Sequence, residues 1–327
     1  MLSSESRIRA LLALFAALVL ALGVAACGDD DDDGGDGGGD ASGELIESNP
    51  DNSGVELTVG SKNFTEALIL GEIYAQALEA AGYSVNTDLN LGSEQVALKA
   101  LQQGEISGYP EYTSTALTSF FNKTADEVPA ESQAAYEDAK AELESEGLTA
   151  FAPTPFADSN AVGMLTSRAE ELDVTTGSDL EGKSQDLVLA GSPECRQRVD
   201  CLVGLQDVYG LQFKEFTPVD IELRYPVLDD GEADLSILFT SDANLAASDQ
   251  YTLLEDDQGI FPAGNVIWIT DQQVVEEAGP DYQTTIEKVQ EGLSLEVMQE
   301  LNSRVDLDKE EPAAVATQYL QESGYVE

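Results

Sequence analysis

Strand-like and helix-like runs alternate along this chain from Glu56 onward, and two proline-containing breaks divide the alternation into three stretches. The breaks are Pro153-Thr154-Pro155 and Phe261-Pro262. Alternation of this kind predicts an α/β fold whose sheets are covered by helices. The folded part is longer than one core usually holds, so we expect two lobes. We assign residues 55–154 and a return segment, 261–327, to lobe I and residues 155–260 to lobe II. The chain then crosses between the lobes twice, as in a hinged ligand trap.

The expected elements follow from hydrophobic periodicity and from helix start and stop signals. Asn63, with Glu66 three residues later, forms a capping-box pattern that predicts a helix ending at Ala81, before Gly82. Further helices are expected over 93–104, with an apolar stripe of Val96, Ala97, Ala100 and Leu101, over the acidic stretch 131–146, and from a second capping-box start at Ser178. Strands are expected at 57–59, 85–91, 161–165, 187–190, 213–216, 234–239 and 265–270.

The N-terminus has the pattern of an export signal. Arg7 and Arg9 precede an apolar run, which passes into small residues before Cys27. A basic start, an apolar core and small residues before a cleavage point describe a signal peptide over 1–26. The end of this segment, Val24-Ala25-Ala26-Cys27, resembles the bacterial lipobox, which implies lipidation of Cys27. A permanent transmembrane anchor is the alternative, but it requires a longer apolar run. We expect an extracytoplasmic lipoprotein anchored to the outer face of the cell membrane, or a periplasmic protein.

Residues 27–54 begin with aspartates diluted by glycines, from Gly28 to Asp40, and this run contains no residue able to seed a core. Such a segment is expected to be a disordered tether that repels itself. Calcium binding is conceivable with so many carboxylates, but ordering glycine-diluted aspartates around an ion is entropically unfavourable. We therefore expect no metal site and no cofactor.

The chain is strongly acidic, with 15 lysines and arginines against 63 aspartates and glutamates, a net charge of −48. Such a surface repels nucleic acid and anionic headgroups. The sequence contains no histidine, which removes the usual general base and the commonest metal ligand. It also lacks a nucleophile elbow and the glycine spacing of a phosphate-binding loop. A carboxylate-dependent hydrolase is the enzymatic alternative; we expect that the protein is not an enzyme.

If Cys27 is lipidated, Cys195 and Cys201 remain, and an even pair in an oxidising compartment indicates a disulfide. On one regular helix their Cα atoms would lie about 9 Å apart, too far for a bridge. A disulfide therefore predicts a bend between the two cysteines. Two separate thiols are the alternative.

The stretch Gly108-Tyr109-Pro110-Glu111-Tyr112-Thr113-Ser114-Thr115-Ala116-Leu117 combines two tyrosines with three hydroxyl residues. Because Pro110 allows a helix only after it, Tyr112 and Thr115 are expected on one helix face. An aromatic wall and a hydroxyl group would then converge on a small molecule. A half-buried core tyrosine is the alternative.

Eight short motifs occur in order along the chain. They are Gly60-Ser61-Lys62-Asn63-Phe64-Thr65-Glu66, Leu91-Gly92-Ser93, Tyr109 to Thr115, Pro193-Glu194 followed by Arg198 and Asp200, Tyr209-Gly210-Leu211, Leu223-Arg224-Tyr225, Leu254-Glu255-Asp256-Asp257 and Phe261-Pro262. Together they resemble the substrate-binding lipoproteins of ABC importers for quaternary-ammonium osmoprotectants, the OpuAC/ProX-like family. The resemblance covers nearly the whole mature chain. It implies a two-lobed periplasmic-binding-protein (Venus-flytrap) fold.

The resemblance also implies ligand-binding residues. Tyr112 corresponds to a cage tyrosine, with Thr115 beside it as a hydroxyl donor. Asp158 corresponds to a cleft aspartate, and Arg198 to the arginine that receives a betaine carboxylate. Aromatic faces suit a trimethylammonium group because it has no hydrogen-bond donor, and a carboxylate suits an arginine. For Arg198 the alternative is a surface arginine paired with Glu194 or Asp200. A disulfide around Arg198 would order it before the ligand arrives.

Other cage positions depart from the family pattern. Asn160 and Phe239 stand where tyrosines are common, and Phe261 supplies a fourth aromatic group. Asn160 replaces a ring with an amide that can donate and accept hydrogen bonds, which favours a polar zwitterion or a larger betaine derivative over choline. The alternative for Asn160 is a strand-edge residue outside the pocket.

The resemblance implies a function as well. A monomeric binding protein would capture glycine betaine, choline, proline betaine or a related zwitterionic solute between its lobes. It would deliver that solute to a membrane permease that works with an ATPase subunit. A binding lipoprotein of the same fold for another polar solute, and a ligand sensor, are the alternatives.

Overall fold

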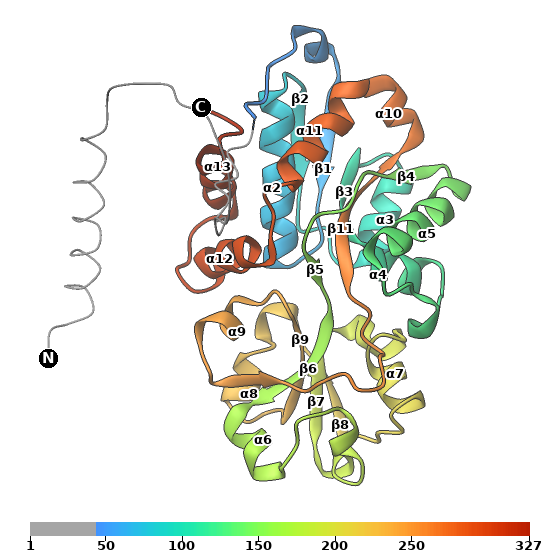
Figure 1. Ribbon diagram of the computed structural model, residues 1–327, viewed down its shortest axis with the longest axis vertical. Helices are drawn as coiled ribbons and strands as arrows, with labels where there is room; N and C mark the ends of the chain where they lie inside the picture. Colours follow the sequence, from blue (N-terminus) through green and yellow to red (C-terminus); the bar gives the residue numbers. More distant parts are fainter. Residues whose placement is uncertain (1–43) are drawn as a thin grey trace, which may run out of the picture. The chain divides into compact units, whose positions relative to one another are not determined.

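The computed structural model describes residues 44–327. The predicted signal peptide, Cys27 and the tether up to residue 43 lie outside the described residues. Residues 44–327 form two lobes, each built on its own β-sheet (Figure 1). Lobe I contains both the first and the last part of this stretch, and lobe II contains the middle. The predicted α/β architecture with two crossings is confirmed.

The sheet of lobe I has the strand order β2-β1-β3-β11-β4, and β5 pairs with β11 as well. Strands β1 to β3 are parallel, whereas β11 runs antiparallel to β3 because it belongs to the return segment. The middle of β11 is completely buried, as its uninterrupted apolar sequence requires. The strand bounds are β1 Glu56–Gly60, β2 Ser84–Asp88, β3 Gly108–Tyr112, β4 Leu148–Ala150, β5 Ala157–Asp158 and β11 Gly264–Asp271.

Helix α2, Thr65–Ala80, is the central helix of lobe I and packs against α11, α12 and α13 (Figure 1). Its apolar residues surround the axis, so it is buried on most sides. It ends before Gly82, whose φ of 99° stops the helix as predicted. The other helices of lobe I are α3 Glu94–Gln102, α4 Thr113–Thr115, α5 Ser132–Ser145, α10 Gln272–Ala278, α11 Pro280–Gln290, α12 Leu295–Asp306 and α13 Pro312–Glu322.

Lobe II has the strand order β10-β6-β9-β7-β8. Strand β7 is parallel to both neighbours, and β6 is antiparallel to β9 and β10. Its strands are β6 Asn160–Leu165, β7 Val188–Gly191, β8 Glu215–Pro218, β9 Leu235–Phe239 and β10 Tyr251–Leu253. Its helices are α6 Thr166–Leu172, α7 Leu202–Asp207, α8 Pro226–Asp229 and α9 Ala243–Ala247.

The two crossings between the lobes lie side by side and are hydrogen-bonded to each other. Asp158 pairs with Gly264 in the ladder between β5 and β11, and β6 begins only two residues after Asp158. The Asn265 amide donates to the carbonyl oxygens of Thr154 and Phe156, each at 2.9 Å. The first crossing therefore lies a few residues beyond the expected boundary at residue 154, because β5 still pairs within lobe I.

The expectation of a disordered tether through residue 54 is wrong for its last part. Ile46 is buried, and its backbone N–H donates to the Tyr325 carbonyl at 2.9 Å. Residues Pro50–Gly54 form a 3-10 helix. The buried Asn52 side chain donates to the Ala81 carbonyl at 2.9 Å, at the end of α2. Lobe I therefore includes at least residues 46–54, because these contacts anchor them.

Two local predictions about helix starts are wrong. Phe64, not Asn63, is the N-cap of α2, and it makes no side-chain capping bond. Glu66 does not reach back to the cap, because it accepts hydrogen bonds from Tyr112 and Asn302 inside the protein. The capping pattern at Ser178 leads only to a 3-10 turn, Ser178–Leu180.

Pro110 lies inside strand β3, and the helix expected after it begins only at Thr113. Only Gly108 of β3 pairs with β1, so Pro110 lies beyond the part of β3 that has a neighbour on that side. Tyr112 therefore ends a strand, and its expected place on one helix face with Thr115 is wrong. In helix α3, Val96 is 47% exposed, so the predicted apolar stripe is narrower than expected.

Gly108→Ala should destabilise lobe I. A Cβ at Gly108 would lie 2.5 Å from the Trp268 ring, which is fully buried and cannot move aside. Overpacking of this kind lowers the free energy of unfolding by roughly 1–3 kcal/mol. Urea unfolding should show this loss. The control Gly54→Ala, whose Cβ would meet nothing within 4 Å, should unfold as the wild type does. Equal midpoints for both variants would contradict the prediction.

Candidate ligand-binding site

A cavity of about 90 Å³ lies between the lobes. One water requires roughly 10–15 Å³ of such space, so the cavity holds a solute of several heavy atoms. All seven residues predicted to bind ligand line it, namely Tyr112, Thr115, Asp158, Asn160, Arg198, Phe239 and Phe261. The other residues used below that line it are Lys62, Phe64, Glu94, Glu194, Asp200 and Arg224.

In the described part of the chain, no group of acidic or cysteine side chains could hold a metal ion. Nor does this part contain a helix of the length and apolarity that crossing a bilayer requires.

Three aromatic rings form one wall of the cavity. Phe64 lies 6.3 Å from Tyr112 and 5.4 Å from Phe239, measured between ring centroids. Each ring lies within reach of a basic side chain. The Lys62 ammonium lies 4.5 Å from the Tyr112 ring, and the Arg224 guanidinium lies 3.9 Å from the Phe239 ring. These rings are therefore oriented so that their electron-rich faces attract positive charge.

The Tyr112 hydroxyl donates to Glu66 at 2.5 Å, behind the aromatic wall. Asn302 also donates to Glu66, at 2.9 Å. Burial raises the pKa of Glu66, and these hydrogen bonds oppose the shift. The bond from Tyr112 fixes the ring so that it stands in the cavity wall.

Asp158 is buried at the crossing between the lobes. It accepts hydrogen bonds from the Thr240 hydroxyl at 2.7 Å and the Ser241 backbone N–H at 2.9 Å. Burial, followed by the nearby Glu66 charge, raises the pKa of Asp158 to about 7. Near neutral pH this carboxyl group is therefore poised to change its charge, and a cation in the cavity would favour the ionised form.

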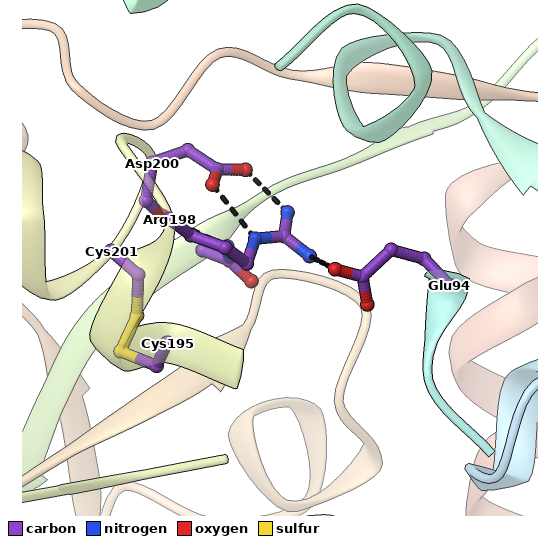
Figure 2. Close-up of a disulfide and its surroundings, with 6 residues drawn as sticks. Glu94, Cys195, Arg198, Asp200 and Cys201 are labelled. Carbon is purple, nitrogen blue, oxygen red and sulfur yellow. Dashed lines mark hydrogen bonds and ion pairs between the residues drawn. A yellow bond between two sulfur atoms is a disulfide. The ribbon is translucent and has the colours of Figure 1, made fainter. Parts of the chain in front are cut away.

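A disulfide joins Cys195 and Cys201, whose Cα atoms are 5.2 Å apart, and Arg198 lies in the loop that it closes (Figure 2). The cysteines are close because a 3-10 helix, Pro193–Gln197, ends in an extended residue before α7. Arg198 donates to both carboxylate oxygens of Asp200, at 2.8 and 2.5 Å. Arg198 thus lines the cavity, as expected for a ligand-binding residue, and it also pairs with Asp200, as the alternative interpretation expected.

Asn160 lines the cavity and is not a strand-edge residue outside it. Its amide donates to the backbone carbonyl of Asp200 at 3.0 Å. Asn160 therefore holds the loop that carries Arg198.

Sequence reasoning missed several cavity residues, chiefly Lys62, Phe64, Glu94 and Arg224. Lys62 and Phe64 lie in the Gly60 to Glu66 motif, and Arg224 lies in Leu223-Arg224-Tyr225. These two motifs could therefore have identified Lys62, Phe64 and Arg224 as candidate cavity residues. Glu94 follows the Leu91-Gly92-Ser93 turn directly, but nothing distinguishes it from the many other glutamates of the chain.

The model of the family described as the substrate binding domain of ABC-type glycine betaine transport systems matches residues 55–322. The glycine-betaine-binding protein of Pseudomonas aeruginosa is 31% identical over 277 residues, which cover 81% of this chain and 87% of that protein.

Two further similarities concern a transport protein and a solved structure. The ergothioneine transport permease/ergothioneine binding protein of Helicobacter pylori is 27% identical over 82% of this chain, and the match spans 48% of that protein. A crystal structure described as a glycine betaine/carnitine/choline ABC transporter has a TM-score of 0.64 and 25% identity, and covers 81% of this chain and 97% of that one.

Proposed function

Because the chain belongs to the family of substrate-binding domains of ABC-type glycine betaine transport systems, we propose that it captures a quaternary-ammonium solute between its lobes and delivers it to a permease. The family consists of binding proteins of ABC transporters and not of enzymes. The observation that carries the proposal is the wall of Phe64, Tyr112 and Phe239, which faces a small cavity with the buried Asp158 beside it.

Capture follows from the chemistry of this wall. A trimethylammonium group cannot donate a hydrogen bond, so its attraction comes from aromatic faces and from nearby negative charge. Asp158 supplies that charge from the crossing between the lobes. Residues from both lobes line the cavity, so closure of the lobes around a solute would exclude water and strengthen these interactions.

Lipidation of Cys27 and the permease and ATPase partners belong to this proposal. A lipid anchor would hold the binding protein beside its permease outside the cytoplasm. The fused permease and binding protein of Helicobacter pylori supports the pairing of such a domain with a permease. A ligand sensor of the same fold would bind the solute equally well. However, the membrane permease would not take up the solute when the sensor is supplied as its binding protein.

Calorimetric titration tests the binding step. We expect saturable one-to-one binding of at least one among glycine betaine, choline, proline betaine and carnitine, and no binding of uncharged sugars. If none of the four bound while an ordinary amino acid did, the proposed function would be wrong. Uptake of the bound solute by membrane vesicles that contain the permease and its ATPase, dependent on added binding protein, separates the importer from the sensor.

The affinity for a quaternary-ammonium cation should rise roughly 5- to 10-fold between pH 5 and pH 8, because a cation interacts better with ionised Asp158. Asp158→Asn should flatten this profile, and Asp179→Asn, in a half-buried 3-10 turn of lobe II outside the cavity lining, should keep it. Because the folded pKa of Asp158 is raised, its contribution to stability is present at low pH and is lost as the pH rises through about 7. The unfolding free energy of the ligand-free protein should therefore fall over the same window. A flat affinity profile in the wild type would contradict the prediction.

A further inference from the structure

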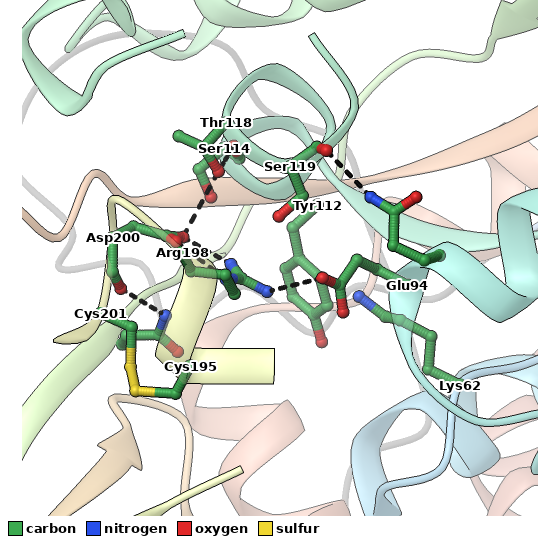
Figure 3. A network of polar contacts seen from close by, with 12 residues as sticks. Lys62, Glu94, Tyr112, Ser114, Thr118, Ser119, Cys195, Arg198, Asp200 and Cys201 are labelled. Atoms are coloured by element: carbon green, nitrogen blue, oxygen red, sulfur yellow. Dashed lines mark hydrogen bonds and ion pairs between the residues drawn. A yellow bond between two sulfur atoms is a disulfide. The ribbon is translucent and has the colours of Figure 1, made fainter. Parts of the chain in front are cut away.

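Every guanidinium nitrogen of Arg198 already faces a carboxylate of the protein (Figure 3). Nε and Nη2 donate to Asp200, and Nη1 lies 3.7 Å from the nearer oxygen of Glu94. Burial lowers the pKa of Arg198, but the neighbouring carboxylates of Asp200 and Glu94 outweigh burial. The pKa of Arg198 therefore lies above its ordinary value. The arginine predicted to receive a ligand carboxylate is thus neutralised before any ligand binds.

Glu94 reaches Arg198 from the opposite lobe. It is the first residue of α3 in lobe I, and only 7% of its surface is exposed. Within residues 44–327 its ion pair with Arg198 is the only one that joins the lobes. Beside this ion pair the Thr118 hydroxyl of lobe I lies 3.4 Å from Asp200, but it donates its proton to the Ser114 carbonyl at 2.9 Å. Glu94 therefore occupies, from lobe I, the side of Arg198 that a ligand carboxylate would need.

The other basic groups of the cavity are paired as well. Lys62 forms an ion pair with the buried Glu111, and Arg224 forms one with Asp242 at 2.8 Å. Two acids of the lining, Asp158 and Glu194, have no basic partner within 4 Å among residues 44–327. The charge balance of the cavity is consequently negative, and each of its basic groups has a carboxylate partner, although Nη1 of Arg224 donates no hydrogen bond.

We infer that this cavity selects quaternary-ammonium solutes without a carboxylate, such as the cationic alcohol choline, over zwitterionic betaines, and that Glu94 sets this preference. The inference rests on the proposed function and narrows its ligand. A betaine carboxylate that approaches Arg198 must displace Glu94 or lie against its charge, and such built-in repulsion is an effective source of specificity. A solute with only a positive charge leaves the pair between the lobes intact, so the solute and the pair stabilise closure together. The preference is opposite to the one that Asn160 and Phe239 suggested in the sequence.

Calorimetric titration of choline and glycine betaine into three proteins tests the inference. The wild type should bind choline at least 10-fold more tightly than glycine betaine. Glu94→Gln keeps the size of the side chain but frees Nη1 of Arg198, so the ratio of the two affinities should move toward glycine betaine by 30-fold or more. Glu105→Gln removes one negative charge at an exposed position of lobe I outside the cavity lining and breaks no ion pair, and should change that ratio by less than threefold. Thermal unfolding of both variants checks that the fold is kept.

Three results would overturn the inference. The first is a wild type that binds glycine betaine as tightly as choline, and the second is an equal change of the ratio in both variants. In either case the proposed function stands, because a quaternary-ammonium solute still binds. The third is a wild type that binds neither these two solutes nor carnitine nor proline betaine, and this result removes the proposed function together with the inference.

Discussion

Replacing Lys62 by methionine should lower the midpoint of thermal unfolding by roughly 6–15 °C, the largest stability effect that we expect from one substitution. Lys62 is 5% exposed, and its partner Glu111 is completely buried in strand β3. The two side chains form an ion pair, and Lys62 also faces the rings of Tyr112 and Phe64. Removal of one partner of a buried pair costs about 3–5 kcal/mol because the remaining charge has no counterion.

The dependence of this loss on pH identifies its cause. Burial raises the pKa of Glu111, and Lys62 opposes the shift. Without Lys62 the folded pKa of Glu111 rises further, and a carboxyl group with a raised folded pKa loses its stabilising contribution as pH increases. The deficit of Lys62→Met should therefore be larger at pH 9 than at pH 6, as measured by thermal unfolding in low salt.

Two further variants serve as controls. Lys62→Met combined with Glu111→Gln removes the uncompensated charge and should recover at least half of the lost stability. Lys288→Met removes an ion pair with the exposed Glu44, and exposed pairs contribute only about 0–1 kcal/mol. A double variant as unstable as the single one would show that the loss comes from packing and not from the charge of Glu111.

The two-lobed architecture was predictable because its signals are local. Proline-containing breaks, glycine stops and apolar runs marked both crossings and most strands. Family motifs then placed seven residues that the structure brings to one cavity, although they come from distant parts of the chain. Tyr112 and Phe261 are examples, since they reach the cavity from the end of β3 and from the second crossing.

The pairing of charges was not predictable in the same way. With 63 acidic residues, the sequence does not show that Glu111 faces Lys62 or that Glu94 faces Arg198. These pairs depend on register between strands and on the approach of two lobes, which no local pattern encodes. Pro110 limited the helix start correctly, since α4 begins after it at Thr113, but it did not show that strand β3 continues through Tyr112. Its missing N–H is tolerated in β3 only because β1 has already ended there.

Replacing Tyr112 by alanine should weaken the binding of a quaternary-ammonium solute roughly 30- to 100-fold, the largest effect on binding that we expect. The Tyr112 ring is only 5% exposed, packs beside the Phe64 ring in the cavity wall, and has the Lys62 ammonium 4.5 Å from its centroid. Its loss removes one aromatic face and opens the wall to water, which also weakens the attraction of the remaining charges. Calorimetric titration with the tightest-binding solute measures the change.

Tyr112→Phe separates the ring from its hydroxyl group. The ring face remains, but Glu66 loses the hydrogen bond that it accepts from Tyr112 at 2.5 Å and keeps the one from Asn302. Because a cation interacts with the face and not with the hydroxyl, affinity should fall less than about threefold, while the protein should lose about 1 kcal/mol of stability. The stability loss should be smaller at low pH, because Glu66 is then protonated and its buried carboxyl group carries no negative charge for the Tyr112 hydroxyl to stabilise. If Tyr112→Phe weakened binding as much as Tyr112→Ala, the hydroxyl group would be the ligand contact, and the aromatic wall would not explain why this cavity attracts a cation.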